Sequence, residues 1–437
     1  MDFEDKLKLV RKSGPRATRS EKINRAWQEI SRQRELSTRE KLERLIRLTK
    51  ESGPKKEPPL PAETERRLPL QIFENDFPVR ARYGRVPIEA GLKISGKTLF
   101  LLSRDENFGH LDLGSALFLD CETTGLSGGV GVVPFLVGLG FYGDNKFHVV
   151  QFFLGDLAFE EQLIHELQLF LSRMNFRSVV TFNGKAFDLP LLETRFILHR
   201  AELALSGLPH LDFLFAARNL WGHKHESCRL YFLAQEVLGA DRAEDIPSAE
   251  IPARYFQFLR SGDFGLIEPV LYHNQEDILS LLGIVTVGGA LLDEEMEAVS
   301  ECRIDGLDLF GAARVLERRG DVERSARFIQ RALETKLPED ISVLAKKKLA
   351  SYFKRQRDWL QAVRLWEQVT PLGHLFCFRE LAMYYEHREK DYEKARQLAE
   401  EGFIIAQGIS KSYTQDFSRR LERLKKKLAH RKSMENK

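Results

Sequence analysis

The sequence predicts an α/β domain with a mixed sheet flanked by helices, followed by an all-α region of helical repeats. Strand-like segments rich in β-branched and aromatic residues occur between residues 116 and 182, and helical patterns alternate with the later ones. The last third of the chain instead repeats a helical pattern. A chain of 437 residues, 43% of them hydrophobic, is long enough to fill the cores of both regions.

The N-terminal segment, residues 1–67, has a different composition from the α/β domain. Residues 1–70 contain 19 Lys and Arg against 12 Asp and Glu, with short helical patterns between the charges. The Pro-rich stretch at 52–63 predicts an extended linker. We therefore expect a basic segment that is partly helical or disordered, and we place the α/β domain at residues 68–295.

The α/β domain can be followed element by element. Residues 68–112 have a mixed, short-stranded pattern, which we interpret as a lead-in packed against the domain. Apolar runs predict strands at 134–142, 147–153 and 178–182, and helices at 160–172 and 228–238. No Gly-Lys-Ser or Gly-Lys-Thr follows the glycines at 125, 128, 129 and 131, so they predict a tight turn and not a nucleotide-binding loop.

Asp120 and Glu122 lie two positions apart at the end of an apolar run, directly before a Thr-Thr-Gly turn. Residues i and i+2 of a strand point to the same face, so the two carboxylates project together while Cys121 faces the other way. Burying two acids side by side is costly unless a cation neutralises them, and Mg²⁺ or Mn²⁺ binds carboxylate oxygens. A surface strand ending in a solvated turn is the alternative for this pattern.

Two later segments contain further polar candidates. Asp188 follows the strand at 178–182 and an Asn-Gly turn, and it begins a helical pattern in which helix capping is the alternative to metal binding. His273 and Asp277 are one helical turn apart, so their side chains share a face. An exposed polar first turn of a helix is the alternative for that segment.

In this order, the three segments resemble the motifs of the DEDD superfamily of 3′–5′ exonucleases, which have a ribonuclease H-like fold. The resemblance covers about residues 95–290 and rests on Asp120-x-Glu122-Thr-Thr-Gly-Leu, Asn183-Gly-Lys-Ala-Phe-Asp188 and His273-x-x-x-Asp277. The chain is most similar to the bacterial YprB-like branch, in which helical repeats can accompany such a domain. The resemblance implies hydrolysis of phosphodiester bonds in single-stranded nucleic acid.

The general base is the point at which this chain departs from the family pattern. Histidine-type members have four residues between the base and the last Asp, and tyrosine-type members have three. Here His273 has the tyrosine-type spacing and Tyr272 the histidine-type spacing. We favour His273, because an imidazole with a pKa of about 6.5 accepts a proton at neutral pH, whereas a tyrosine with a pKa of about 10 mainly orients water.

The resemblance also implies a cofactor and a role for each acid. Two divalent ions, Mg²⁺ or Mn²⁺, about 3.5–4 Å apart would generate the nucleophile and stabilise the leaving oxygen. Asp120 would bridge both ions, and Glu122 and Asp277 would complete the site that activates water. Asp188 would hold the second ion directly or through water, and His273 would take the proton.

The last third of the chain predicts helical repeats at residues 300–410. Segments that begin at Gly320, Arg357 and Lys390 recur at intervals of 37 and 33 residues, each between two apolar helical patterns. They resemble three degenerate tetratricopeptide repeats, with small residues at the equivalent positions Ser325, Ala362 and Ala395. An ordinary helical bundle is the alternative. Since the region has no constellation of acids or thiols, we expect it to bind a protein partner or to position nucleic acid.

Charge is concentrated at the two ends of the chain. Residues 411–437, a predicted helix or tail, contain 10 Lys and Arg against 3 Asp and Glu, so each end carries +7 and the remainder −11. Basic flanks of this kind attract a polyanion, and solvated helical faces are the alternative explanation. The cysteines at 121, 228, 302 and 377 have no metal or disulfide spacing, which predicts reduced thiols.

We expect a cytoplasmic protein with no membrane segment. The longest strongly apolar run, 132–142, is too short to cross a bilayer, and the chain starts without an apolar signal segment. The first function to test is a divalent-metal-dependent 3′–5′ exonuclease acting on single-stranded DNA or RNA. The alternative is a non-catalytic nucleic-acid-binding adaptor that recruits protein partners through its repeats, which would have no need of four converging acids.

Overall fold

The computed structural model describes residues 69–125, 131–242, 245–294 and 299–435. The chain divides into two compact units, Met1–Glu65 and Arg66–Lys437. The expected basic segment at 1–67, with its Pro-rich linker, lies outside the described residues, as do the glycines at 128 and 129.

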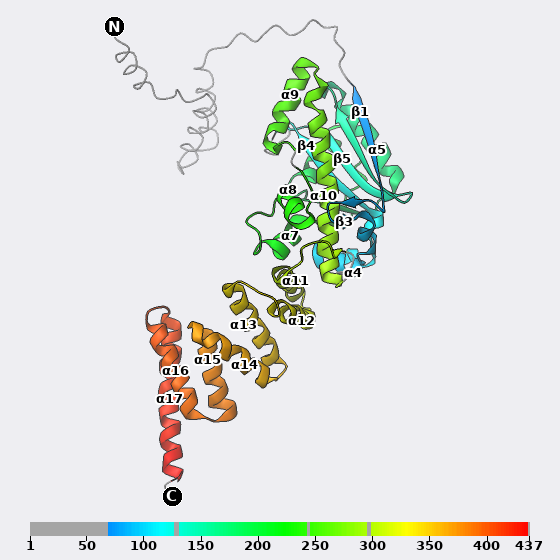
Figure 1. Ribbon diagram of the computed structural model, residues 1–437. Helices are drawn as coiled ribbons and strands as arrows, with labels where there is room; N and C mark the ends of the chain where they lie inside the picture. The colour runs from blue at the N-terminus through cyan, green and yellow to red at the C-terminus, as the bar shows by residue number, and fades with distance from the viewer. Residues whose placement is uncertain (1–68, 126–130, 243–244, 295–298, 436–437) are drawn as a thin grey trace, which may run out of the picture. The chain divides into compact units, whose positions relative to one another are not determined.

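Six strands form one mixed sheet in the order β1-β6-β5-β4-β7-β8 (Figure 1). The first four in this order pair antiparallel, and β7 and β8 continue from β4 in parallel. Asp144 and Asn145, both with positive φ, make the two-residue turn that favours the β5–β6 hairpin. The strands are β1 (Leu70–Pro78), β4 (Ala116–Thr123), β5 (Pro134–Gly143), β6 (Lys146–Leu154), β7 (Ser178–Thr181) and β8 (His210–Asp212).

Helices cover both faces of this sheet because its strands alternate apolar side chains between them. Leu119 and Phe152 pack with α5, α6 and α9, whereas Phe118 and Val149 share a core with α7 and α10. A short ribbon of β2 (Arg82–Tyr83) and β3 (Val86–Pro87) lies between β1 and the first helix. The helices are α4 (Gly96–Ser103), α5 (Glu160–Met174), α6 (Asp188–Leu198), α7 (Phe213–Trp221), α8 (Leu230–Leu233), α9 (Ile251–Ser261) and α10 (Glu268–Asp293).

Helix α10 packs across β4 and β5 because two glycines of β5 leave room for it (Figure 1). A Cβ at Gly138 would overlap the side chain of Asn274, and one at Gly140 would overlap Ile278. The segment Phe264–Asp293 is long and apolar enough to cross a membrane, but 89% of its most apolar window is buried inside the protein. Its apolar character is therefore that of a core helix.

The C-terminal helices form successive antiparallel pairs. In each pair the turn has a residue with positive φ (Gly320, 80°; Arg357, 61°; Lys390, 56°), and the next residue is an Asp whose side chain caps the second helix. The predicted small residues Ser325, Ala362 and Ala395 are buried. The helices are α11 (Gly306–Arg318), α12 (Val322–Leu333), α13 (Glu339–Arg355), α14 (Trp359–Val369), α15 (Leu375–Tyr384), α16 (Tyr392–Gln407) and α17 (Lys411–Glu435).

The predicted fold class is confirmed: a mixed sheet flanked by helices precedes a helical region. Two local expectations change. The segment at 68–112 is more than a lead-in, since β1 pairs along its whole length with β6 as an edge strand of the sheet. The predicted helix at 228–238 starts at Leu230 and finishes as a π-helical turn, Ala234–Leu238. The basic C-terminal residues form one long helix, α17, packed on α16.

Candidate active site

Strand β4 directs Asp120 and Glu122 toward α10, as their spacing predicts. Asn274 donates from Nδ2 to Asp120 Oδ2 at 2.8 Å, and His273 Nε2 lies 3.7 Å from Glu122 Oε1. Cys121 packs in the core on the other face of the sheet. The pairing of β4 with β5 shifts register between Glu122 and Thr123, so the strand becomes irregular directly after the two acids, a feature common beside functional sites.

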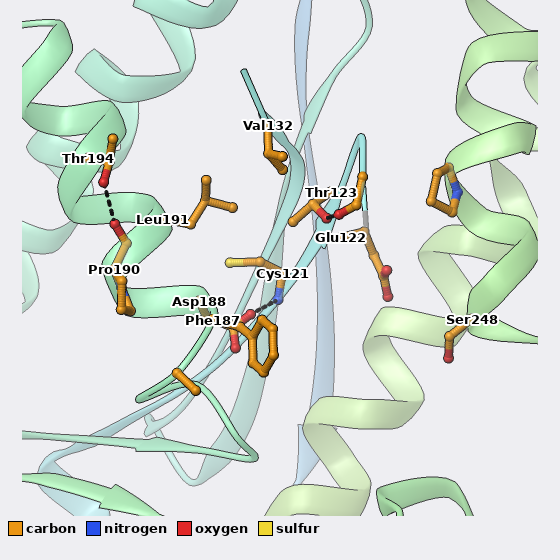
Figure 2. Close-up of a pocket in the computed structure, with 13 residues that line it drawn as sticks. Cys121, Glu122, Thr123, Val132, Phe187, Asp188, Pro190, Leu191, Thr194 and Ser248 are labelled. Carbon is orange, nitrogen blue, oxygen red and sulfur yellow. Dashed lines mark hydrogen bonds between the residues drawn. The ribbon is translucent and has the colours of Figure 1, made fainter. Parts of the chain in front are cut away.

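Asp188 reaches the same place from the first turn of α6. Its Oδ1 accepts a hydrogen bond of 3.1 Å from the backbone amide of Cys121, shown as a dashed line in Figure 2. The carboxylate therefore binds across to β4 instead of capping its own helix. Asp212 stabilises the turn that precedes Asp188, because it accepts hydrogen bonds from the backbone amides of Asn183 at 2.7 Å and Lys185 at 3.2 Å. Asp212 is thus a structural residue.

Helix α10 supplies the remaining candidates. His273 Nε2 lies 3.5 Å from Asp277 Oδ2, which agrees with the shared helical face inferred from their spacing. Asn274, between them in sequence, is completely buried and accepts from Gln151 Nε2 at 2.9 Å while it donates to Asp120. The structure therefore brings Asp120, Glu122, Asp188, His273 and Asp277 to one region, where β4 meets α6 and α10.

Asp245 and Arg242 are the residues that sequence reasoning missed. Asp245 Oδ1 lies 2.6 Å from His273 Nδ1, so the imidazole donates there, while Nε2 lies 3.3 Å from Ser248 Oγ and faces Glu122 and Asp277. Arg242 is completely buried, contacts Asp277 Oδ1 at 2.5 Å and also pairs with Asp245. Their positions in the sequence follow no periodic pattern that would indicate a site. Asn274, by contrast, lies beside His273 in the third motif, and that position could have identified it as a site residue.

Burial and mutual repulsion govern the charges of this cluster. Burial raises the pKa of Asp120, and the charges of Asp277 and Asp188 raise it further. The pKa of Glu122 is raised by burial and then by Asp120 and Asp277. Burial also raises the pKa of Asp188 to about 6. The folded protein therefore holds these carboxylates where, without a compensating cation, their ionised forms are disfavoured.

The histidine has the opposite balance. Burial alone would lower the pKa of His273, but the hydrogen bond to Asp245 and the charges of Asp277 and Asp245 outweigh it and raise the pKa. Its side chain is buried, whereas Tyr272 next to it is 39% exposed. Of these two candidate bases, His273 is the one that lies against Glu122 and Asp277.

The donor chemistry fits a hard divalent cation, because the cluster presents carboxylate oxygens in a partly buried setting that disfavours their charge. Asp120, Glu122, Asp188 and Asp277 are the residues that would hold such an ion. Within the described part of the chain, no group of three or more His, Cys, Asp or Glu side chains has the arrangement of a formed metal site. Asp277 already shares its carboxylate with Arg242.

Two pockets open beside the acids. One, of about 500 Å³, is lined by Glu122 and Asp188 together with apolar side chains that include Val132, Phe187 and Leu191 (Figure 2). The other, of about 920 Å³, is lined by His273, Asp277 and Asp245. Volumes of this size accommodate small-molecule ligands or their fragments. Ser248 lines both pockets, so they adjoin at the candidate site.

Comparisons with known proteins place this geometry in a family. The model of the RNase_H superfamily matches residues 117–287, which contain the acids, His273 and Asp277. The uncharacterized protein YprB of Bacillus subtilis (strain 168) is 33% identical over 367 residues, covering 82% of this chain and 86% of YprB. A family B DNA polymerase from the hyperthermophilic archaeon Pyrobaculum calidifontis matches 47% of this chain and 29% of its own, with 13% identity and a TM-score of 0.32. The chain therefore belongs to the family of YprB, and its sheet region is a ribonuclease H-like domain.

Proposed function

We propose that the chain is a divalent-metal-dependent 3′–5′ exonuclease that hydrolyses single-stranded nucleic acid. One observation carries the proposal: four carboxylates and a histidine, distant in sequence, converge where β4 meets α6 and α10. The match to the RNase_H superfamily supports a nuclease-type activity. The resemblance of the three motifs to DEDD exonucleases supports the direction of cleavage.

The acids are proposed as ligands of two ions, Mg²⁺ or Mn²⁺, with Asp120 as the shared ligand and Glu122, Asp188 and Asp277 as the others. When bound, the ions supply positive charge to the phosphodiester and to the attacking water. The protein itself contributes a partly buried cluster of oxygen donors whose charges need such compensation. Removal of the ions by a chelator is expected to abolish hydrolysis.

His273 is proposed as the general base. Asp245 accepts from Nδ1–H and fixes the tautomer in which Nε2 accepts a proton from water on the side of Glu122 and Asp277. Arg242 forms ion pairs with both Asp245 and Asp277 and so holds the two carboxylates in place. Asp245 and Arg242 are therefore positioning residues, since each acts through a neighbouring group.

The smaller pocket is proposed to hold the terminal nucleotide. Val132, Phe187 and Leu191 present apolar surface beside Glu122 and Asp188, and Phe187 is 52% exposed. A base with its flat faces free stacks or packs on such side chains, whereas a base within a duplex offers only its edges. This arrangement favours a single-stranded end as the substrate.

The helical region is proposed to consist of three degenerate tetratricopeptide repeats at residues 300–410 that bind a protein partner. The support is the equivalent turn in each helix pair, with its positive φ and capping Asp. We also propose the domain limits 68–295 and 300–410 and a cytoplasmic location.

A non-catalytic adaptor is the second candidate. The ion pair between Arg242 and Asp277 favours it, because a protein cation already neutralises one of the four acids. In that case the domain would bind nucleic acid without cleaving it, and the repeats would recruit a protein.

The deciding experiment follows end-labelled single-stranded DNA and RNA oligonucleotides with Mg²⁺, Mn²⁺ or EDTA, comparing the native chain with Asp120→Ala. We expect metal-dependent shortening from the 3′ end that disappears in Asp120→Ala and weakens in His273→Ala but not in Tyr272→Phe. Binding without cleavage under every metal condition would establish the adaptor instead. Full hydrolysis by His273→Ala with loss in Tyr272→Phe would move the base to Tyr272.

A further inference from the structure

The larger pocket contains side chains that the proposed mechanism does not use. Besides His273 and Asp277, it is lined by Arg218, Arg229 and Tyr231. Both arginines are exposed, and the Tyr231 side chain is 43% exposed. The pocket therefore connects the candidate site to a surface with cationic and aromatic groups.

Helix α7 separates this pocket from another of about 760 Å³. Leu214 and Arg218 line the first pocket, whereas Phe215 and Asn219, one position further along the helix in each case, line the second. Phe215 is 52% exposed although it is a large apolar residue. Leu214 and Arg218 are four residues apart, as are Phe215 and Asn219, so each pair spans about one turn of α7. Together the four residues form the side of α7 between the two pockets, which we call the α7 ridge: Leu214, Phe215, Arg218 and Asn219.

The second pocket adds cations from two further elements. Arg104 follows α4, and Lys185 belongs to the turn before Asp188; both are exposed and line this pocket. Asn183 of the same turn lines the first pocket. The α7 ridge and this turn thus lie between the two pockets, and of these two only the larger is lined by residues of the candidate site.

The first helix of the helical region meets the ridge. Arg318 of α11 donates to Asn219 Oδ1, and Arg314 of α11 lies 3.3 Å from His223 Nδ1, just past the end of α7. Burial and the charge of Arg318 lower the pKa of Arg314, and burial and the charge of Arg104 lower the pKa of Arg319. Cations are therefore crowded here, which an anion would relieve.

The acidic side chains at this surface are fewer or already engaged. Asp212 in the second pocket is 4% exposed and accepts from three backbone amides. Asp105 accepts from Asn107 at 3.0 Å as a helix cap. Glu106 and Glu226 are exposed acids that line the pockets and moderate the positive potential.

We propose that the α7 ridge, with Arg104, Lys185 and Arg318, binds the phosphate backbone of the nucleic-acid strand upstream of the bond that is cleaved. The proposal rests on the function proposed above and names the strand as the ligand because the larger pocket joins the ridge to His273 and Asp277. Guanidinium groups bind phosphates in a forked geometry, and exposed Phe215 and Tyr231 offer stacking surfaces for unpaired bases. The strand would thus run from the sheet region onto the first helix of the repeats.

The test compares binding of 5′-labelled oligonucleotides of 4 and 20 nucleotides by fluorescence anisotropy, in the Asp120→Ala background so that nothing is degraded. The variants are Arg218→Glu, Arg318→Glu and, because it removes no charge, Phe215→Ala. Arg173→Glu is the matched control, since Arg173 is an exposed arginine of α5 that lines neither pocket. Degradation of both oligonucleotides by the chain with intact Asp120 is measured in parallel.

The arginine variants should bind the 20-mer at least 10-fold more weakly, with the salt slope reduced by about one per lost phosphate contact, while the 4-mer and the control change less than 2-fold. Phe215→Ala should weaken only the 20-mer, by about 10-fold. Equal affinity of the three variants and Arg173→Glu for the 20-mer, or equal losses for both lengths, would overturn the proposal. Degradation by the parent chain would then show that the nuclease function stands without the ridge, whereas failure of the parent to bind or degrade either oligonucleotide would overturn both.

Discussion

His273 illustrates how a side chain acquires a function from neighbours that its sequence motif does not include. Its Nδ1 faces Asp245, and its Nε2 lies 3.3 Å from Ser248 Oγ and faces Glu122 and Asp277 at slightly longer distances. Asp245 is itself held by Arg242, a completely buried arginine. The orientation of the imidazole thus depends on residues about 30 positions earlier in the chain.

Asp245→Asn should lower kcat of hydrolysis about 100-fold and change KM less than 2-fold. The amide can donate to Nδ1, which would leave the proton on Nε2 and remove its capacity as a base. Steady-state kinetics well below the melting temperature would measure the two constants. The control is Asp263→Asn, which changes an exposed helix cap in the same chemical way. An unchanged kcat would show that Asp245 does not position the base.

At the scale of elements, the site depends on the close packing of α10 against β5. Gly138 and Gly140 leave the space that Asn274 and Ile278 occupy. Asn274 then donates a hydrogen bond to Asp120. Asp277, on the next turn of α10, lies near His273. Two glycines in a strand are unfavourable by themselves, and here their absence of side chains is what allows the helix to approach.

Gly138→Ala should destabilise the protein by about 1–3 kcal/mol, because the added methyl group overlaps Asn274 and α10 must shift. Urea unfolding would show the loss as a lower midpoint at constant m-value. Gly109→Ala is the matched control, since a Cβ there meets no atom within 4 Å. If both variants had the same midpoint, the packing of α10 would tolerate the extra volume.

The junction between the last helix pair and α17 centres on Glu386. Its side chain is completely buried and pairs with Arg420 at 2.7 Å, Arg423 at 2.7 Å and Lys427 at 2.9 Å. Burial alone would raise its pKa, but hydrogen bonds from Arg423 and Lys427 lower the pKa to about 2. One carboxylate thus forms ion pairs with three cations of α17.

This pKa predicts an acid-dependent stability. A carboxyl group whose pKa falls on folding stabilises the protein fully above its unfolded pKa, about 4.5, and the contribution is lost as the pH falls toward 2. Glu386→Gln should lose roughly 3 kcal/mol already at neutral pH and show less further loss between pH 4.5 and 2. Amide hydrogen exchange of α15, α16 and α17, followed as a function of pH, would measure the free energy of unfolding of this region in both proteins. Parallel pH profiles for both proteins would contradict the assignment.

At the scale of the whole molecule, positive charge is concentrated in the sequence at the two ends of the chain, whereas the candidate site is acidic. Helix α17 exposes Lys425, Lys426 and Lys432, and the N-terminal residues 1–67 are basic in sequence. If these flanks contact phosphates, binding should weaken with salt in proportion to the number of contacts.

Removal of residues 1–67 combined with Lys425→Gln, Lys426→Gln and Lys432→Gln should reduce the slope of log affinity against log salt by about 2 or more. The measurement is titration of a single-stranded oligonucleotide at several salt concentrations. Replacing the exposed acids Glu400 and Glu401 of α16 by Gln is the control for altered surface charge in the helical region. A slope equal to that of the native chain would show that the basic flanks make no phosphate contacts and are only solvated.

Patterns of neighbouring residues predicted the fold and most of the candidate site, and contacts across the chain supplied the rest. Alternating apolar residues located β5 and β6 within one or two positions, and the i, i+4 relation located His273 against Asp277. β1 was not assigned to the sheet, because an edge strand is half exposed and its pattern is weak. Arg242 and Asp245 escaped notice, since nothing in their local spacing reflects a partner on α10.

The candidate site is assembled from residues that leave the ribosome at different times. Asp120 precedes Asp277 by 157 positions, and at about 5–20 residues per second it is synthesised roughly 8–30 seconds earlier. Until α10 has been made and has packed over Gly138 and Gly140, the nascent chain carries acids without the histidine and without the last carboxylate. Residues 294–437 are synthesised after α10, so the candidate site can be completed while the chain is still attached to the ribosome, but not before α10 has emerged.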